Sequence, residues 1–113
     1  MIQVVWSEEV DALFCVGQSL EPLGVRNWAI DQAGTLDVLE RLRALGIAVA
    51  GGDVYRRNSD GLESTYDDWY CNREADESET SYLERSVELA RRYILDYPNA
   101  EGDALFALVP VVR

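Results

Sequence analysis

The sequence predicts an α+β fold, with about three helices packed on a mixed, mostly antiparallel sheet of four or five strands. Apolar residues recur at three- and four-residue steps in three segments, and short apolar or alternating runs separate those segments. A chain of 113 residues can bury a hydrophobic core without disulfides or metals. We expect one globular domain over residues 1–113, because no repeat or low-complexity tract interrupts the pattern.

The first quarter of the chain is expected to form a strand, a helix and a second strand. Residues 1–6 (MIQVVW) predict the first strand, and Ser7 provides an N-cap for the helix that follows. The buried stripe of this helix would consist of Val10, Leu13, Phe14, Gly17 and Leu20. The segment EPLG (21–24) ends the helix, and VRNWAI (25–30) alternates as a strand does.

A second helix and a buried strand are expected next. Thr35 provides an N-cap for the helix LDVLERLRALG (36–46), and Gly46 favours its C-terminal end. The core face of this helix would consist of Leu36, Leu39, Leu42 and Leu45. The unbroken apolar start of IAVAGGDVY (47–55) indicates a strand in the middle of the sheet, buried on both faces.

The second half predicts a hairpin, a long helix and a last strand. Residues 56–65 (RRNSDGLEST) are polar and predict a long exposed hairpin loop, with YDDWYCN (66–72) as the second arm. A third helix should run from about Glu79 to Tyr97 and end before Pro98. ALFALVPVV (104–112) is the last strand, and Pro110 favours a strand end or a sheet edge.

The two glycines of GGDVY (51–55) directly follow the apolar start of the expected strand and need an explanation. A phosphate-binding loop is disfavoured, because such loops need more glycines at fixed positions and a helix directly after them. A β-bulge or a close approach of another backbone explains the glycines better. We expect the bulge to turn Asp53 and Tyr55 toward the surface, where the polar loop begins.

The charge of the chain restricts the class of partner. The formal net charge is −11, from 21 acids against 10 basic residues, all of them arginine. Nine acids and one arginine lie between Asp60 and Glu84, so −8 of the charge is concentrated there. Such a chain is repelled by nucleic acid and by anionic membranes and attracted to basic proteins, although acidity also serves solubility alone.

The missing residue types restrict the chemistry. Histidine is absent, which removes the commonest general base and transition-metal ligand. Cys15 and Cys71 lack the spacing of a metal or redox motif and are expected to be partly buried, reduced residues. The N-terminus does not resemble a signal peptide, and no apolar run is long enough to span a bilayer. We therefore expect a cytoplasmic protein without a cofactor, in which any catalysis would have to rest on carboxylates, tyrosine or arginine.

Aromatic residues accompany the acids. Alternation along YDDWY predicts that Tyr66, Asp68 and Tyr70 share one face of the strand, whereas Asp67 and Trp69 share the other. Exposed rings act as anchors in protein interfaces. The predicted partner-binding residues are Asp53, Tyr55, Asp60, Glu63, Asp67, Asp68, Trp69 and Tyr70.

Two other functions remain open from the residues alone. Asp53, Asp67 and Asp68 could gather as oxygen ligands for Mg²⁺ or Ca²⁺, or two of them could act as the acid and base of a hydrolase. The second of these functions is that of an acidic adaptor subunit with an unrelated partner. The spacing of the carboxylates along the chain does not match a metal-binding pattern, so we predict no metal site.

Four segments together resemble the immunity protein 40 family of bacterial polymorphic toxin systems: GVRNWAI, LDVLERLRALGIAVAGGDVY, DWYCNR and SYLERSVELARRYI. The resemblance covers about Gly24 to Ile94, and NWAI followed by GGDVY is its most specific part. It implies a small cytoplasmic protein that binds a cognate toxin domain, blocks it by occlusion and carries no catalytic residues. Asp53 and Tyr55 match the GGDVY motif.

Overall fold

The computed structural model describes residues 7–111, so the strand predicted for residues 1–6 lies outside the described residues. Five strands form a sheet in the order β1-β2-β5-β3-β4, and its four neighbouring pairs are all antiparallel. The strands are β1 (Gln18–Ser19), β2 (Trp28–Asp31), β3 (Val49–Asn58), β4 (Gly61–Tyr70) and β5 (Ala104–Pro110). The α+β prediction is confirmed, and the sheet is antiparallel throughout the described residues.

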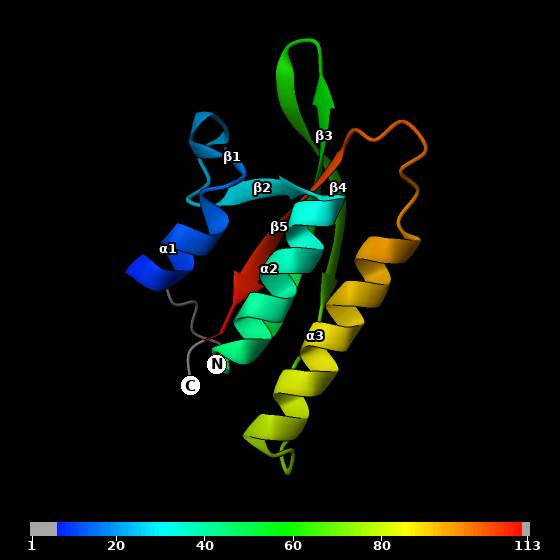
Figure 1. Cartoon of the computed structure of the whole chain (residues 1–113). Coiled ribbons are helices and arrows are strands. Elements are labelled where there is room, and N and C mark those ends of the chain that lie inside the picture. Colours follow the sequence, from blue (N-terminus) through cyan, green and yellow to red (C-terminus); the bar gives the residue numbers. More distant parts are fainter. Residues whose placement is uncertain (1–6, 112–113) are drawn as a thin grey trace.

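Three α-helices accompany this sheet: α1 (Glu8–Phe14), α2 (Gln32–Ala44) and α3 (Glu79–Asp96). Helices α2 and α3 lie side by side and cover one face of the sheet, as Figure 1 shows. The hairpin of β3 and β4 extends past the rest of the sheet at its upper end in that view. None of the helices within residues 7–111 is long and apolar enough to cross a membrane.

Buried side chains lie on both faces of the sheet. The face under α2 and α3 contributes Val54 and Phe106 to the main core. The opposite face, which we call the outer face, carries Leu105 and Tyr55, and Leu20 packs against it. Successive β5 residues alternate between the two clusters, as the pleat of a strand requires. The predicted central, doubly buried position of the β3 segment is confirmed.

The first helix is shorter than predicted. It ends at Phe14, and Gln18–Ser19 pair with β2 instead of continuing the helix to Leu20. A Cβ on Gly17 would lie 2.6 Å from the Ala29 carbonyl oxygen, so this glycine allows the chain to approach β2 closely. Close packing against a neighbouring strand therefore overrides the helical spacing.

The second helix begins earlier than predicted. Asp31 is its N-cap, because its carboxylate accepts a hydrogen bond from the Gly34 amide at 2.8 Å. Thr35 is buried inside the helix, where its hydroxyl donates to the Asp31 carbonyl at 2.6 Å. Gly46, with φ of +74°, follows the helix end as expected, whereas Leu45 remains exposed instead of facing the core.

The long loop predicted for residues 56–65 is wrong. Strand β3 runs to Asn58 and β4 starts at Gly61, so the connection is a two-residue turn. The polar composition misled the prediction because this end of the hairpin extends beyond the sheet and has no core to cover. Asp103 secures the hairpin: its carboxylate pairs with Arg56 at 2.9 Å and its carbonyl accepts from the Arg57 amide.

The last two elements agree with the sequence. Helix α3 is capped by Ser78 and buries Tyr82, Ser86 and Ile94 along one side. Strand β5 ends at Pro110, because proline has no amide hydrogen to donate to a neighbouring strand.

Candidate functional site

The glycines of GGDVY accommodate a tryptophan. A Cβ on Gly52 would overlap the indole of Trp69, which lies opposite it on β4, and a Cβ on Gly51 would overlap the Trp69 carbonyl oxygen. The register of β3 also shifts against β5 between Val49 and Gly51. The predicted bulge and close backbone approach are confirmed, and both serve to bury the Trp69 ring.

Two carboxylates meet on the outer face of the hairpin. Asp53 and Asp68 are directly opposite each other in the β3–β4 ladder, and both are exposed. Within residues 7–111 neither side chain forms a hydrogen bond or an ion pair. Partial burial, and then the charge of Asp68, raises the pKa of the Asp53 carboxyl above its ordinary value. Like charges in this position destabilise a sheet, so this pair has a cost to folding.

The predicted alternation of YDDWY separates two of the expected contact residues. Tyr70 lies opposite Gly51 on the outer face and is 74% exposed. Asp67 and Trp69 point to the other face, where the Tyr97 hydroxyl of α3 donates to Asp67 Oδ2 at 2.6 Å. The Trp69 ring stacks on Tyr93 with 4.6 Å between centroids, and its buried indole Nε1 finds no hydrogen-bond partner among the described residues. Trp69 is therefore a core residue and is not available for direct contact.

The remaining predicted residues do not join this surface. Tyr55 is 7% exposed, because Leu20 and Leu62 cover it on the outer face, so the bulge exposes Asp53 but not Tyr55. Asp60 and Glu63 are exposed near the hairpin tip. Five residues of β3 separate the level of Asp53 from the turn, which corresponds to roughly 17 Å of strand. The structure thus brings together Asp53, Asp68 and Tyr70 out of the predicted set.

Tyr66 is an exposed residue that the predicted set lacks. Its side chain is 92% exposed, and its φ of +66° is a conformation that residues other than glycine rarely adopt. It occupies the point where β4 shifts register against β3, between the pairs Asp53–Asp68 and Tyr55–Ser64. Alternation in the sequence suggests its exposure, but nothing in the sequence indicates its backbone conformation.

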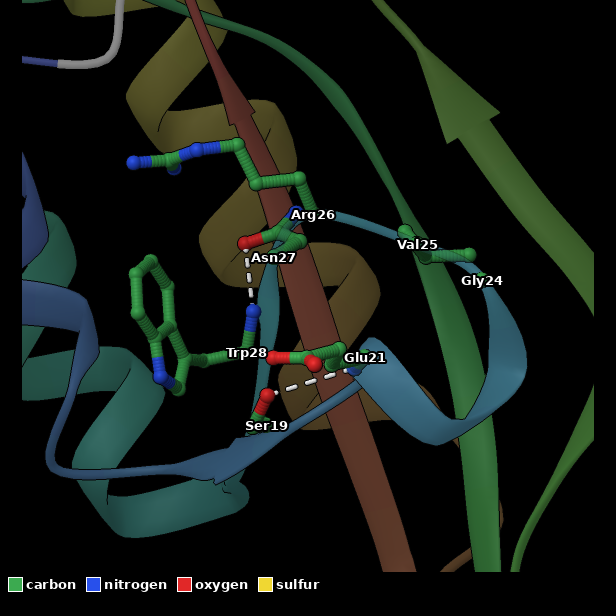
Figure 2. Close-up of a pocket in the computed structure, with 7 residues that line it drawn as sticks. All are labelled: Ser19, Glu21, Gly24, Val25, Arg26, Asn27 and Trp28. Atoms are coloured by element: carbon green, nitrogen blue, oxygen red, sulfur yellow. Dashed lines mark hydrogen bonds between the residues drawn. The ribbon is translucent and has the colours of Figure 1, made fainter.

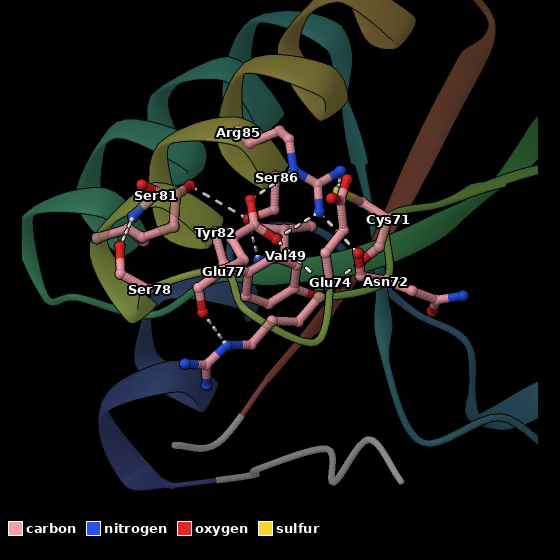
Figure 3. A network of polar contacts seen from close by, with 12 residues as sticks. Val49, Cys71, Asn72, Glu74, Glu77, Ser78, Ser81, Tyr82, Arg85 and Ser86 are labelled. Carbon is pink, nitrogen blue, oxygen red and sulfur yellow. Dashed lines mark hydrogen bonds and ion pairs between the residues drawn. The ribbon is translucent and has the colours of Figure 1, made fainter.

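A second acidic region lies between β4 and α3, and one of its carboxylates, that of Glu77, is neutralised internally (Figure 3). The Arg85 guanidinium donates to both carboxylate oxygens of Glu77 at 2.7 Å and to the Asn72 carbonyl at 2.7 Å. Arg85, and then the Glu74 amide, lowers the pKa of the Glu77 carboxyl to about 2. The Tyr82 hydroxyl donates to the Cys71 carbonyl at 2.6 Å. These contacts hold the connecting segment against α3, so the charge of Glu77 has a structural role.

The described residues contain no metal-binding group. No set of three or more Cys, Asp or Glu side chains within residues 7–111 could hold a metal ion. Asp67 lies on the opposite face from Asp53 and Asp68, so the three aspartates do not converge as the metal hypothesis required. Cys71 is buried, and burial raises the pKa of its thiol, whereas Cys15 is exposed, contrary to expectation.

A separate hollow of about 540 Å³ lies beside the β1–β2 connection (Figure 2). Its walls include Glu21, Arg26 and Trp28. Arg26 pairs with Asp11 at 2.9 Å and lies over the Trp28 ring, 5.7 Å from its centroid. On the opposite strand, Ser19 Oγ accepts a hydrogen bond from the Glu21 amide at 3.2 Å.

Comparison with protein families gives one match. The family model described as Immunity protein 40 matches residues 19–110, from the second residue of β1 to the end of β5, which includes four complete strands and both helices that cover the sheet. No curated protein and no solved structure matches the chain. The match extends beyond the segments that carried the resemblance and leaves only α1 and the chain ends outside. The chain therefore belongs to the immunity protein 40 family, which implies a toxin-neutralising function with a cognate toxin as its partner.

Proposed function

We propose that this protein binds a basic toxin domain through the outer face of the β3–β4 hairpin and blocks it by occlusion. The toxin would belong to a polymorphic toxin system, and neutralisation would take place in the cytoplasm of the producing cell. Family membership supports a non-enzymatic inhibitor in general. The choice of surface and the occlusion mechanism are the proposal.

The unpaired carboxylates Asp53 and Asp68 are the observation that carries the choice of surface. Arginines neutralise carboxylates elsewhere in the molecule, in eight ion pairs within the described residues, yet none reaches this pair. Two facing carboxylates that raise the energy of the free protein would gain most from a cation supplied by a partner. A toxin lysine or arginine placed between them would relieve the repulsion.

The surroundings of the pair suit a protein partner. Tyr70 is exposed beside Asp68 on the same strand face, so the carboxylates have an aromatic neighbour. Tyrosine contributes a large contact area at low entropic cost, and carboxylates around it steer a basic partner toward it. Asp60 and Glu63 at the tip extend the negative field and are expected to affect the association rate more than the dissociation rate.

Association kinetics with the purified cognate toxin domain test this proposal. We expect a stable complex whose association rate constant falls by roughly ten-fold or more when ionic strength rises from about 0.02 to 0.5 M. A Glu9→Gln variant is the matched control: Glu9 is exposed on α1, outside the matched region, and its loss should leave the salt dependence nearly unchanged. A salt-independent rate would exclude electrostatic steering, and absence of any complex would exclude the function.

A further inference from the structure

Tyr66 has a backbone conformation that its residue type disfavours. Its φ of +66° makes it the one residue other than glycine with positive φ within residues 7–111. In this region the Cβ crowds the backbone, a cost that glycine avoids and asparagine reduces. Conformations of this kind persist where the surrounding structure enforces them, and they concentrate at ligand-binding sites.

The enforcing structure is a bulge in β4. Between the pairs Asp53–Asp68 and Tyr55–Ser64, a single β3 residue faces three β4 residues, 65–67. Bulges of this kind turn a side chain out of the regular ladder and interrupt the exposed sheet edge. Here the residue turned out is Tyr66, and its ring is left with 92% of its surface exposed.

Hydrogen bonds fix the bulge from three sides. Thr65 Oγ1 donates to the Val54 carbonyl at 2.9 Å and accepts from the Asp67 amide at 3.1 Å. The Tyr66 amide donates to Ser64 Oγ at 3.0 Å. From α3, the Tyr97 hydroxyl donates to Asp67 Oδ2 at 2.6 Å. The strained turn is therefore tied both to the neighbouring strand and to a helix of the core.

We infer that Tyr66 is a preorganised anchor for the toxin, held in its binding position by Thr65 and Tyr97. A residue that is 92% exposed in the free protein buries little surface and adds little to the stability of the fold, yet its backbone is strained and fixed. Both features are explained if the ring fills a pocket on the partner, because a fixed anchor loses little entropy on binding. This inference rests on the proposed function.

The surrounding charges define the complementary pocket. Asp68 follows the bulge on the same strand and has no cationic partner among residues 7–111, and Asp53 faces it. A phenol ring requires an apolar pocket, and the carboxylates beside it require a basic rim. The matching toxin surface is thus an apolar hollow, deep enough for one tyrosine, with lysine or arginine at its edge.

Substitution of Tyr66 separates anchoring from folding. In Tyr66→Asn, a side chain that tolerates positive φ replaces the ring, so the melting temperature should stay the same or rise. The dissociation constant for the purified cognate toxin should rise at least about 30-fold, as expected for an interface hot spot. Tyr66→Ala should weaken binding to a similar degree. Leu95→Ala, which truncates an exposed apolar side chain of α3, should change affinity less than about two-fold.

A double-mutant cycle tests the positioning role of Tyr97. Tyr97→Phe keeps the ring but removes the hydrogen bond to Asp67, and we expect roughly five-fold weaker binding. In the Tyr66→Ala background the same change should alter affinity less than about two-fold, because no anchor remains to be positioned. An equal effect in both backgrounds would exclude the positioning role.

The outcomes distinguish this inference from the function on which it rests. If the wild-type protein binds toxin and Tyr66→Asn binds equally well, Tyr66 is not an anchor, but the proposed function stands. If the wild-type protein forms no complex with its toxin, the proposed function itself fails, and the inference fails with it.

Discussion

The two acidic regions of this molecule differ in what surrounds their carboxylates. In the segment before α3, Glu77 receives two hydrogen bonds from Arg85 and one from the Glu74 amide, and these contacts lower its pKa to about 2. On the hairpin, Asp53 faces Asp68, and burial together with that charge raises its pKa. The same side-chain chemistry thus stabilises the fold in one region and opposes it in the other, depending on whether an arginine is within reach.

The difference shows how to separate structural acids from acids available to a partner. Both regions carry a net negative charge, so the sign of the charge in the sequence cannot distinguish them. Internal neutralisation does distinguish them, because a carboxylate already bound by arginine gains little from a cation of the toxin. Mutation of the arginine-bound Glu77 in the first region should therefore reduce stability, and mutation of the acids in the second should reduce binding.

The largest expected effect on stability comes from breaking the Arg85–Glu77 contact. Glu77→Ala removes the acceptor of two 2.7 Å hydrogen bonds and leaves the Arg85 guanidinium without its main partner. We expect this variant to have the lowest melting temperature of those described here, while toxin affinity at a temperature where it is folded stays close to wild type. Thermal unfolding followed by circular dichroism measures the first quantity and calorimetric titration the second.

Asp76→Ala is the matched control for that variant. It removes an acid from the same exposed segment that forms no ion pair or hydrogen bond within the described residues. Its melting temperature should stay close to that of the wild type. Equal losses for both variants would show that Arg85 does not stabilise this segment through Glu77.

Charge reversal on the hairpin should have the next largest effect, and on binding alone. Asp68→Lys places a cation opposite Asp53, which replaces repulsion by attraction in the free protein. Its melting temperature should therefore be maintained or raised, whereas toxin affinity should fall by roughly 30- to 100-fold. Glu9→Lys changes the net charge equally on α1 and should weaken binding only slightly. If the two variants weakened binding equally, total charge and not this surface would determine affinity.

The smallest expected effect is the pH dependence of stability, which has opposite signs in the two regions. Asp53→Asn removes the repulsion with Asp68 and should stabilise the free protein by about 0.5 kcal/mol at pH 7. Because the pKa of Asp53 is raised in the folded state, its carboxyl binds a proton more tightly there than in the unfolded chain. The gain in stability from Asp53→Asn should therefore disappear as pH falls and the Asp53 carboxyl of the wild type becomes neutral.

For Glu77 the sign is reversed. Its stabilising contribution should be complete above about pH 4.5 and be lost as pH falls toward about 2, where the folded-state carboxyl takes up its proton. Melting curves of wild type, Asp53→Asn and Glu77→Gln between pH 7 and pH 2 check both directions. A gain from Asp53→Asn that persisted in acid would show that it does not arise from charge.

Much of the fold followed from local patterns. The apolar spacing of α3 predicted its extent to within about one residue, because packing, the Ser78 cap and Pro98 agree there. The region around Gln18 was predicted incorrectly, because contact of Gly17 with β2 outweighs helical spacing. The polar hairpin end was read as a loop, because strand pairing outside a core leaves no hydrophobic alternation to detect.

For the site, alternation separated Asp68 and Tyr70 from Asp67 and Trp69, and the acid content indicated the sign of the partner's charge. The burial of Tyr55 was not predictable, because Leu20, 35 positions earlier in the chain, covers it. The conformation of Tyr66 was hidden as well, because its cause is a register shift between two strands.

The sequence by itself determined the class of fold, the family and the negative charge, since these depend on composition and on spacing along the chain. Only the tertiary structure decided which acids are neutralised and which remain available. That outcome depends on distances between residues far apart in the chain, such as Arg56 to Asp103 or Tyr97 to Asp67. Coulombic and hydrogen-bond energies fall steeply with distance. A difference of a few ångströms between an arginine and a carboxylate therefore decides whether that carboxylate is bound internally or stays available to a partner.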